Sequence, residues 1–194
     1  MKQLMLSVGL FIAAITSNAQ DKPKGLNVND KAPVFSAMDQ SGKTVSLKGQ
    51  LKSGAVVLIF YRGQWCPYCN KQLKGLEDSL SLITAKGATL VAVTPEKQEN
   101  ISKTIAKTKA SYPILFDDGL KIMKSYDVAF TVDDKTVEKY KGYGIDFAEV
   151  NGTNGANLPV PAVYIINKEG VIIFKYFDAD YRKRASVQDI LDHL

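Results

Sequence analysis

Cysteine and histidine are scarce in this chain of 194 residues, which has two cysteines and one histidine, His193. A structural zinc site takes four ligands, usually cysteine and histidine side chains. With no third cysteine and with His193 next to the C-terminus, we expect neither a metal site nor a catalytic cysteine–histidine pair. We also expect no bound cofactor.

Long hydrophobic runs are missing as well, apart from residues 4–15 near the N-terminus. This run is too short to span a bilayer comfortably. It follows Lys2 and precedes a small-x-small site that ends at Ala19, which is the pattern of a secretory signal peptide. We predict a signal peptide at residues 1–19 and an exported protein, periplasmic or secreted. No cysteine lies near the cleavage site, so we expect no stable membrane anchor.

The chain has no strong concentration of charge, although its formal net charge is +5. Lysines are spread along the sequence, and the only basic cluster is the modest one at residues 182–184. We interpret this charge as a solvated surface and expect no binding to nucleic acid.

The two cysteines that are present, Cys66 and Cys69, are separated by two residues and follow the apolar run 55–61. Cys66 is predicted at the N-cap of a helix, with Pro67 at the first helical position, which proline favours. The N–H groups and dipole of that helix stabilise a thiolate. We therefore predict that Cys66 is the nucleophile, more exposed and of lower pKa, and that Cys69 is the resolving thiol.

A static structural disulfide is the alternative for this pair, because idle cysteines in an oxidising compartment tend to become disulfides. Removal of residues 1–19 would leave 194 − 19 = 175 residues. A chain of that size does not need a covalent staple to fold. The spacing of the pair therefore favours catalysis.

The rest of the chain alternates strands and helices, which indicates an α/β fold with a central mixed sheet flanked by helices on both faces. After a flexible lead-in at 20–31, we predict one domain over 32–194 that begins with a β-hairpin extension. The predicted strands are 34–38, 44–47, 55–61, 88–93, 113–116, 162–166 and 171–177. The predicted helices are 67–86, 96–108, 120–126 and one from Asp180 onward.

Residues 129–157 fit this scheme least well, because they are rich in glycine, asparagine and tyrosine. A long connection of this kind is either a functional lid or a disordered insert. We favour a lid, because the segment leads directly into Pro161.

Pro161 stands at the mouth of a buried strand, where proline is tolerated. An ordinary strand-initiating proline is one interpretation. The other, which we adopt, is a cis peptide between Val160 and Pro161 that lies against the two cysteines. Val160 would then offer backbone hydrogen bonds to an extended substrate.

Together these motifs resemble the thioredoxin superfamily, most closely its peroxiredoxin-like branch of alkyl hydroperoxide reductase and thiol-specific antioxidant proteins. The resemblance covers roughly residues 30–194 and is carried by residues 32–35, 60–69 and 161–170. It implies a thioredoxin-like fold. Arg184 falls about where peroxiredoxins place an arginine that assists the reactive cysteine. The predicted catalytic residues are Cys66, Cys69, Pro161 and Arg184, and the predicted substrate-binding residues are Trp65, Val160 and Arg62.

Two family features are absent when the sequence is counted from Cys66. Peroxiredoxins carry a Pro-x-x-x-Thr/Ser-x-x-Cys segment, but the positions seven and three before Cys66 hold Ile59 and Gly63. Thioredoxins carry a buried aspartate six residues before the first cysteine, where this chain has Phe60. A proton relay for the second cysteine would need another group or water.

Three functions remain compatible with the sequence. The first is a thiol-dependent peroxidase, in which the Cys66 thiolate attacks a hydroperoxide and becomes a sulfenic acid, and Cys69 condenses with it. The second is an exported thiol:disulfide oxidoreductase that acts on protein disulfides. The third is a non-catalytic binding domain with a structural disulfide. The resemblance favours the peroxidase, with a hydroperoxide as substrate and a thioredoxin-like electron donor.

Overall fold

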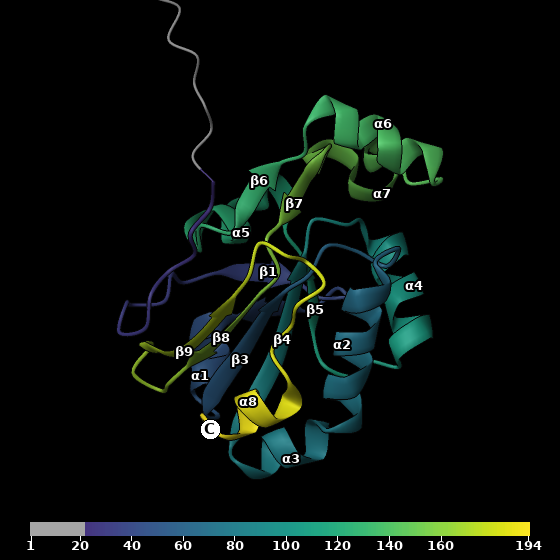
Figure 1. Cartoon of the computed structure of the whole chain (residues 1–194). Helices are drawn as coiled ribbons and strands as arrows, with labels where there is room; N and C mark the ends of the chain where they lie inside the picture. The colour runs from purple at the N-terminus through teal and green to yellow at the C-terminus, as the bar shows by residue number, and fades with distance from the viewer. Residues whose placement is uncertain (1–21) are drawn as a thin grey trace, which may run out of the picture.

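The computed structural model describes residues 22–194, and its centre is a five-stranded mixed sheet (Figure 1). The predicted signal peptide lies outside these residues. The strands follow the order β5-β4-β3-β8-β9, with β3, β4 and β5 parallel to one another and β8 antiparallel to both β3 and β9. Their bounds are Ala55–Phe60 (β3), Ala88–Thr94 (β4), Ile114–Phe116 (β5), Ala162–Ile166 (β8) and Ile172–Phe177 (β9).

Strand β3 lies in the middle of the sheet, paired on both edges, and carries the chain to the cysteine pair. Leu58, for example, pairs with Val91 on β4 and with Tyr164 on β8. Successive side chains of a strand point to opposite faces, so β3 contributes side chains to two separate hydrophobic cores. Val57 and Ile59 pack in one of them and Leu58 in the other, all fully buried. The run of apolar residues without polar alternation is explained by this double burial.

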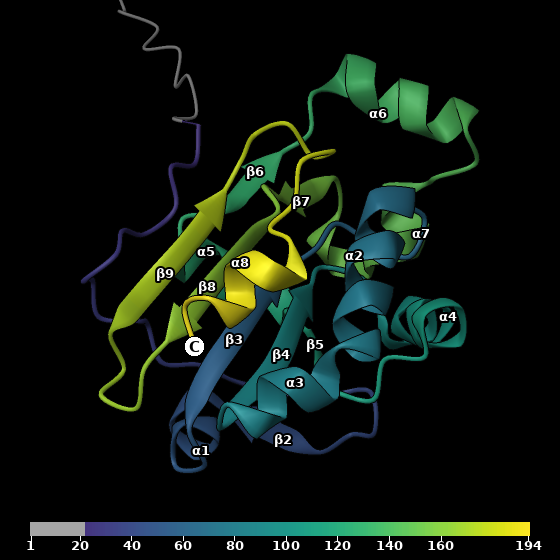
Figure 2. The same ribbon diagram turned by 60° about the horizontal axis from the view of Figure 1, so that its bottom comes forward.

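Helices cover both faces of the sheet (Figure 2). One core contains side chains from α2 (Pro67–Asp78), α3 (Leu80–Ala85), α4 (Gln98–Thr108) and α8 (Val187–Leu191). The other core lies under the hairpin of β1 (Ser36–Met38) and β2 (Thr44–Ser46), α1 (Leu47–Leu51), η1 (Asp118–Leu120) and α5 (Lys121–Ser125). The predicted fold class is therefore confirmed, including the N-terminal β-hairpin.

Two helix predictions differ from the structure. The helix expected over 67–86 is divided at Ser79, which ends α2 and precedes α3. The last helix begins at Val187 instead of near Asp180, because Asp180 accepts hydrogen bonds from the backbone and side chain of Arg182 and holds a turn there. Ser186 then starts α8 with a capping box.

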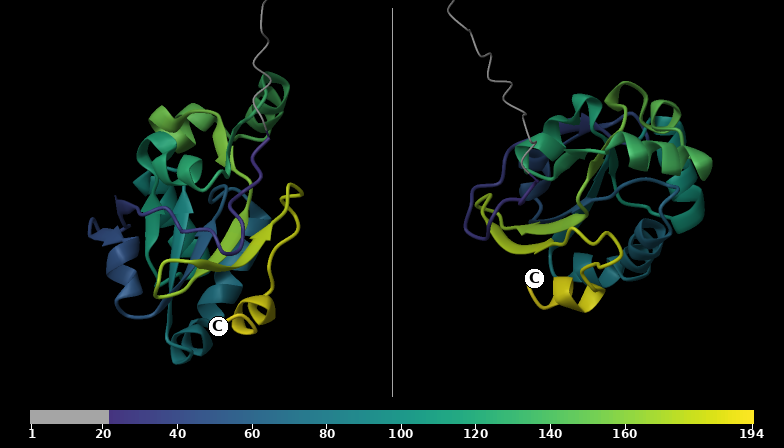
Figure 3. Two further views of the ribbon diagram at one scale, coloured as in Figure 1. Left: turned by 90° about the vertical axis from the view of Figure 1, so that its left-hand side faces the viewer. Right: turned by 45° about the horizontal axis from the view of Figure 1, so that its top comes forward.

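Residues 129–157 are folded into a small unit that lies next to the start of α2 (Figures 1 and 3). The strands β6 (Ala129–Thr131) and β7 (Asn157–Pro159) pair antiparallel and enclose α6 (Asp134–Gly142), α7 (Phe147–Asn151) and η2 (Gly152–Asn154). Helix α6 has no fully buried residue. It therefore needs no apolar stripe, which is the sequence pattern from which a helix is predicted. The unit has a core of its own, around Phe147 and Leu158, which packs against Trp65 of the active-site segment.

Across residues 22–194, the helices are all too short or too polar to cross a bilayer.

Candidate active site

The cysteine pair lies where β3 gives way to α2, with the predicted local geometry. Cys66 is the N-cap of α2 and Pro67 its first helical residue. The Sγ atom of Cys66 accepts a hydrogen bond from the backbone N–H of Cys69 at 3.4 Å. Both sulfur atoms are unbonded thiols, and the exposed fractions of Cys66 and Cys69 are 1% and 0%. The pair is a buried dithiol at a helix N-terminus.

Hydrogen bonding and charge around this dithiol favour negative charge on Cys69, which is the opposite of the predicted order of the two pKa values. Burial raises the pKa of Cys69, but a hydrogen bond from the Cys66 thiol and the charge of Arg184 outweigh it and leave that pKa below its usual range. Arg184 donates from Nη2 to Cys69 Sγ at 3.5 Å. The hydrogen bond to Cys69, followed by burial, raises the pKa of Cys66. The N-terminal dipole acts on both sulfurs, whereas the hydrogen bond from Cys66 and the guanidinium of Arg184 both favour charge on Cys69.

Access from solvent lies on the side of Cys66. A cavity of about 500 Å³ is bordered by Cys66, Trp65 and Arg62, and by Tyr140 of α6. Cys69 lies behind Cys66 and does not line it. A molecule that enters from solvent therefore meets Cys66 before it reaches the thiolate.

Arg62 forms a wall of this cavity and is itself only 4% exposed. Its guanidinium carbon lies 4.2 Å from the ring centroid of Tyr181, 4.9 Å from that of Trp65 and 5.4 Å from that of Tyr140. Its Nη2 atom donates to the hydroxyl of Tyr140. Aromatic faces stabilise a desolvated cation, so Arg62 keeps a positive charge beside Cys66.

Val160 and Pro161 do not form the predicted substrate clamp. No peptide bond in residues 22–194 is cis, so the cis prediction was wrong. The Val160 N–H, which was expected to bind an extended substrate, instead continues the β6–β7 pairing by donating to the carbonyl of Val128 at 2.8 Å. The chain then runs directly into β8. Both residues line a second cavity, of about 320 Å³, which shares Arg62 with the first but includes neither cysteine.

Glu96 is a buried ionisable residue next to the cysteine segment that the sequence analysis missed. It follows β4 and is fully buried, and its Oε2 accepts a hydrogen bond from the Gln64 N–H at 2.7 Å. Its other oxygen, Oε1, has no partner. Burial raises the pKa of Glu96 to about 8, against the hydrogen bond from Gln64, which lowers it. The only signal in the sequence is a glutamate after Pro95, which looks the same as the first residue of a solvated helix.

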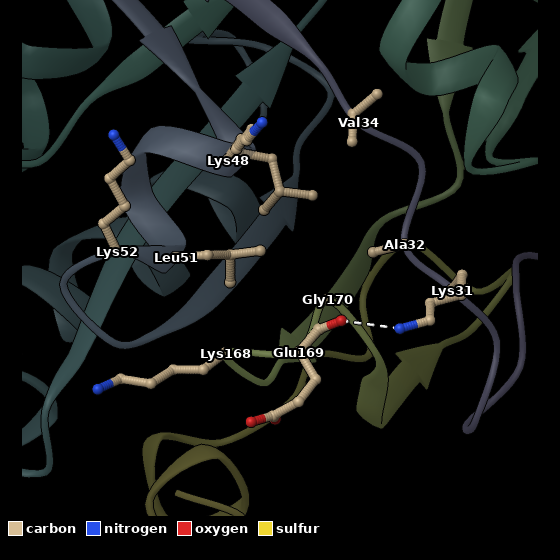
Figure 4. Close-up of a pocket in the computed structure, with 10 residues that line it drawn as sticks. Lys31, Ala32, Val34, Lys48, Leu51, Lys52, Lys168, Glu169 and Gly170 are labelled. Carbon is tan, nitrogen blue, oxygen red and sulfur yellow. Dashed lines mark hydrogen bonds between the residues drawn. The ribbon is translucent and has the colours of Figure 1, made fainter.

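The structure contains another cavity, of about 350 Å³, beside α1 and the β8–β9 turn (Figure 4). It lies at the opposite end of β3 from the cysteines. Four lysines line it, but Figure 4 shows that the ammonium groups of Lys48, Lys52 and Lys168 point away from one another. Lys31 donates to the carbonyl of Glu169 at 2.9 Å. These lysines therefore form no convergent anion site. Likewise, residues 22–194 contain no cluster of three or more metal-ligating side chains.

A substitution at Gly63 would test how tightly the segment before the cysteines is packed. A Cβ atom at this position would lie 2.6 Å from both Glu96 Oε1 and Trp65 Nε1, and both of these atoms are buried. We expect Gly63→Ala to lower the free energy of unfolding by about 1–3 kcal/mol, as overpacking usually does. Urea denaturation measures this change.

Gly75→Ala is the matched control, because Gly75 lies within α2 and a Cβ there would meet nothing within 4 Å. Replacing a glycine inside a helix with alanine should raise stability by roughly 0.5–1 kcal/mol. If the Gly63→Ala protein were as stable as the wild type, the close packing described for this segment would be wrong.

The sequence profile of the AhpC/TSA family matches residues 28–175. The chain is 28% identical over 151 residues to chloroplastic peroxiredoxin Q of Populus jackii, a match that covers 78% of this chain and 60% of that protein. It is 32% identical over 130 residues to the thiol-disulfide oxidoreductase ResA of Bacillus cereus, covering 63% of this chain and 73% of that protein.

Solved structures show the same fold. Peroxidoxin BcpB from Mycobacterium tuberculosis superposes with a TM-score of 0.66 at 18% identity, covering 86% of this chain and 94% of that one. The thioredoxin domain of a thiol-disulfide oxidoreductase from Bacteroides vulgatus gives 0.55 at 21% identity, covering 81% and 93%. The fold is thus thioredoxin-like. With a family profile that spans most of its length and a cysteine pair where the resemblance places it, the chain belongs to the AhpC/TSA family.

Proposed function

We propose that this protein is a thiol-dependent oxidoreductase that reduces hydroperoxides with the Cys66–Cys69 dithiol. The observation that carries the proposal is the guanidinium of Arg184 at 3.5 Å from the buried sulfur of Cys69. A thiolate that attacks a peroxide leaves negative charge on the departing oxygen, and a fixed cation beside the sulfur stabilises that charge. The relationship to peroxiredoxin Q supports the same reaction.

The resting thiolate determines the roles of the two cysteines. Cys69 attacks the terminal oxygen of the hydroperoxide, the O–O bond breaks, and the alkoxide leaves as an alcohol after it takes up a proton. Cys69 becomes a sulfenic acid. The sulfur of Cys66 then attacks the sulfenic sulfur, the hydroxyl group leaves as water with the proton of Cys66, and a disulfide forms. An external dithiol, which we propose to be a thioredoxin-like protein, returns two electrons.

The family pattern agrees with this exchange of roles. Counted back from Cys69 instead of Cys66, the Thr/Ser position of the Pro-x-x-x-Thr/Ser-x-x-Cys segment falls on Cys66, and the proline position falls on Arg62. The thiol of Cys66 donates a hydrogen bond to Cys69, which a hydroxyl at that position could also do. Neither the proline nor the hydroxyl of that segment is present, but a second thiol occupies the position of the hydroxyl.

Burial of the dithiol favours a small oxidant. A protein disulfide must bring its own sulfur into line with the attacking sulfur, and neither cysteine is more than 1% exposed. A hydroperoxide is small enough for the cavity of about 500 Å³ beside Cys66, from which a displacement of the Cys66 side chain would bring it to Cys69. The Val160 N–H, which could have held an extended peptide, is already bonded to Val128.

Disulfide exchange is the second candidate, and one observation favours it. The cysteine that borders the cavity is Cys66, the first of the pair, and the relative ResA is a thiol-disulfide oxidoreductase. In that reaction a movement of α6 would have to expose Cys66. The third interpretation, a binding domain with a structural disulfide, gives no role to Arg184.

Comparing two substrates separates these functions. Reduced protein is mixed with hydrogen peroxide and, separately, with a model protein disulfide, and both second-order rates are measured by stopped flow. We expect the peroxide rate to exceed that of a small thiol by at least roughly tenfold after correction for the thiolate fraction. A peroxide rate no better than that of the small thiol, with rapid exchange of the protein disulfide, would establish the second function instead.

We propose, in addition, that this chemistry takes place outside the cytoplasm. The support for export is the signal-peptide pattern of residues 1–19 alone. Fractionation of cells that express the full chain, with N-terminal sequencing, should find mature protein that begins at Gln20. Protein retained in the cytoplasm with residues 1–19 intact would contradict this proposal.

A further inference from the structure

Glu96 is a buried acid that the peroxidase mechanism does not use. It has no ion pair among the described residues, and its Oε1 atom is enclosed without a partner. Leaving a buried carboxyl oxygen unsatisfied is costly. An acid in such a place is retained more readily in the neutral form, which carries a proton that it can give up.

The carboxyl group of Glu96 is hydrogen-bonded to the segment that carries the two cysteines. Its Oε2 accepts a hydrogen bond from the N–H of Gln64. The carbonyl of Gln64 in turn accepts hydrogen bonds from Asn70 at 2.8 Å and from Lys107 at 2.9 Å. Asn70 directly follows Cys69 on α2. Glu96 and the sulfurs are therefore parts of one rigid assembly.

We propose that Glu96 is the proton-holding group of the dithiol: it stays protonated while Cys69 is a thiolate and releases its proton when oxidation removes the charge from sulfur. The proposal rests on the dithiol cycle, and it applies equally to a peroxide or a disulfide as oxidant. Glu96 interacts with Cys69 electrostatically and does not contact substrate. Its role is to hold and release a proton as the charge on Cys69 changes.

The charges that surround Glu96 agree with this role. Cys69 on α2 disfavours its ionised form, whereas Lys107 and Lys103 on α4 favour it. Tyr61 on β3 is fully buried, and burial, followed by the charge of Glu96, raises its pKa, so it stays neutral. The only strong opposing charge that changes during the redox cycle is the one on Cys69.

Oxidation of the dithiol changes the number of protons that the site holds. Conversion of Cys66–SH and Cys69–S⁻ to the disulfide releases two electrons to the oxidant and one proton. The loss of the thiolate charge lowers the pKa of Glu96, which lies at about 8 in the reduced protein. At a pH between the pKa of Glu96 in the oxidised protein and its higher pKa in the reduced protein, the carboxyl group releases a second proton on oxidation. Reduction takes both protons up again.

Proton release tests this inference without a peroxide. The reduced protein is oxidised in weakly buffered solution by an aromatic disulfide reagent whose released thiols have a low pKa and stay ionised, and the released protons are counted with a pH indicator from pH 6 to 9. Near pH 7.5 we expect the wild type to release close to two protons for each disulfide formed, and Glu96→Gln to release about one. Glu99→Gln, an exposed glutamate three residues along, is the control and should behave like the wild type.

Glu96→Asp keeps an acid at this position and should restore most of the second proton, which a merely structural role would not predict. If Glu96→Gln does not fold, the wild-type pH profile decides, because the extra proton must appear only below about pH 8. Equal proton counts in all variants, or a flat wild-type profile near one proton, would overturn the inference and leave the dithiol cycle intact. A protein that forms no disulfide at all would overturn the proposed function as well.

Discussion

Cys69→Ser is expected to abolish the fast reaction with hydrogen peroxide, with a loss on the order of a hundredfold or more, since the sulfur that Arg184 contacts is gone and burial still disfavours a thiolate on Cys66. Cys66→Ser should still react, because Arg184 remains beside Cys69, but the reaction should stop at the sulfenic acid. Trapping with dimedone followed by mass spectrometry identifies the oxidised sulfur in each variant.

The two serine variants control for each other, since each removes one thiol and leaves the helix N-terminus in place. Serine also caps helices well, so α2 should remain folded in Cys66→Ser. Rapid formation of a sulfenic acid on Cys66 in the Cys69→Ser protein would restore the original assignment, in which Cys66 attacks. The result thus decides between accessibility and charge as the determinant of the attacking sulfur.

The sequence predicted the framework of this site because its signals are local. An apolar strand, a Cys-Pro turn and a helical stripe through Leu73 and Leu76 are each produced by neighbouring residues, and the structure has all three. The predicted N-cap at Cys66 is confirmed for the same reason. Spacing along the chain is enough to determine such features.

The distribution of charge could not be predicted in this way, because it depends on contacts between distant segments. Arg184 is 115 positions after Cys69, and no periodicity indicates which of the two sulfurs it will reach. Glu96 likewise reaches the cysteine segment only because β4 lies beside β3 in the sheet. A helix dipole alone favours the N-cap thiol, and that is why the sequence analysis assigned the lower pKa to Cys66.

The segment 129–157 shows a third limit of sequence reasoning. Its helix α6 buries no residue completely, so hydrophobic periodicity is too weak to predict it. The segment nevertheless contacts the cysteine segment, in part through Tyr140, whose ring packs against Trp65 at 5.2 Å between centroids. In the sequence, a tyrosine that makes such a contact looks the same as an exposed tyrosine in a loop.

Arg184→Gln should reduce the peroxide rate by at least about tenfold near neutral pH, which corresponds to about 1.4 kcal/mol of barrier. Two effects contribute. Without the guanidinium, the pKa of Cys69 rises, so less thiolate is present. The departing oxygen also loses the positive charge that lies beside Cys69. Stopped-flow rates between pH 5 and 10 separate these effects, because only the first is reversed at high pH.

Arg182→Gln is the matched control, since this arginine is two residues away and pairs with Asp180 at the surface. It should change the peroxide rate little. At a pH where Cys69 is fully ionised in both proteins, exchange with a small disulfide should be nearly equal in Arg184→Gln and in the wild type, whereas the peroxide reaction should remain slow. If the peroxide rate recovered completely at high pH, Arg184 would serve only to form the thiolate. Since a thiolate serves both reactions equally, the geometry around Cys69 would then no longer favour a peroxidase over a disulfide exchanger.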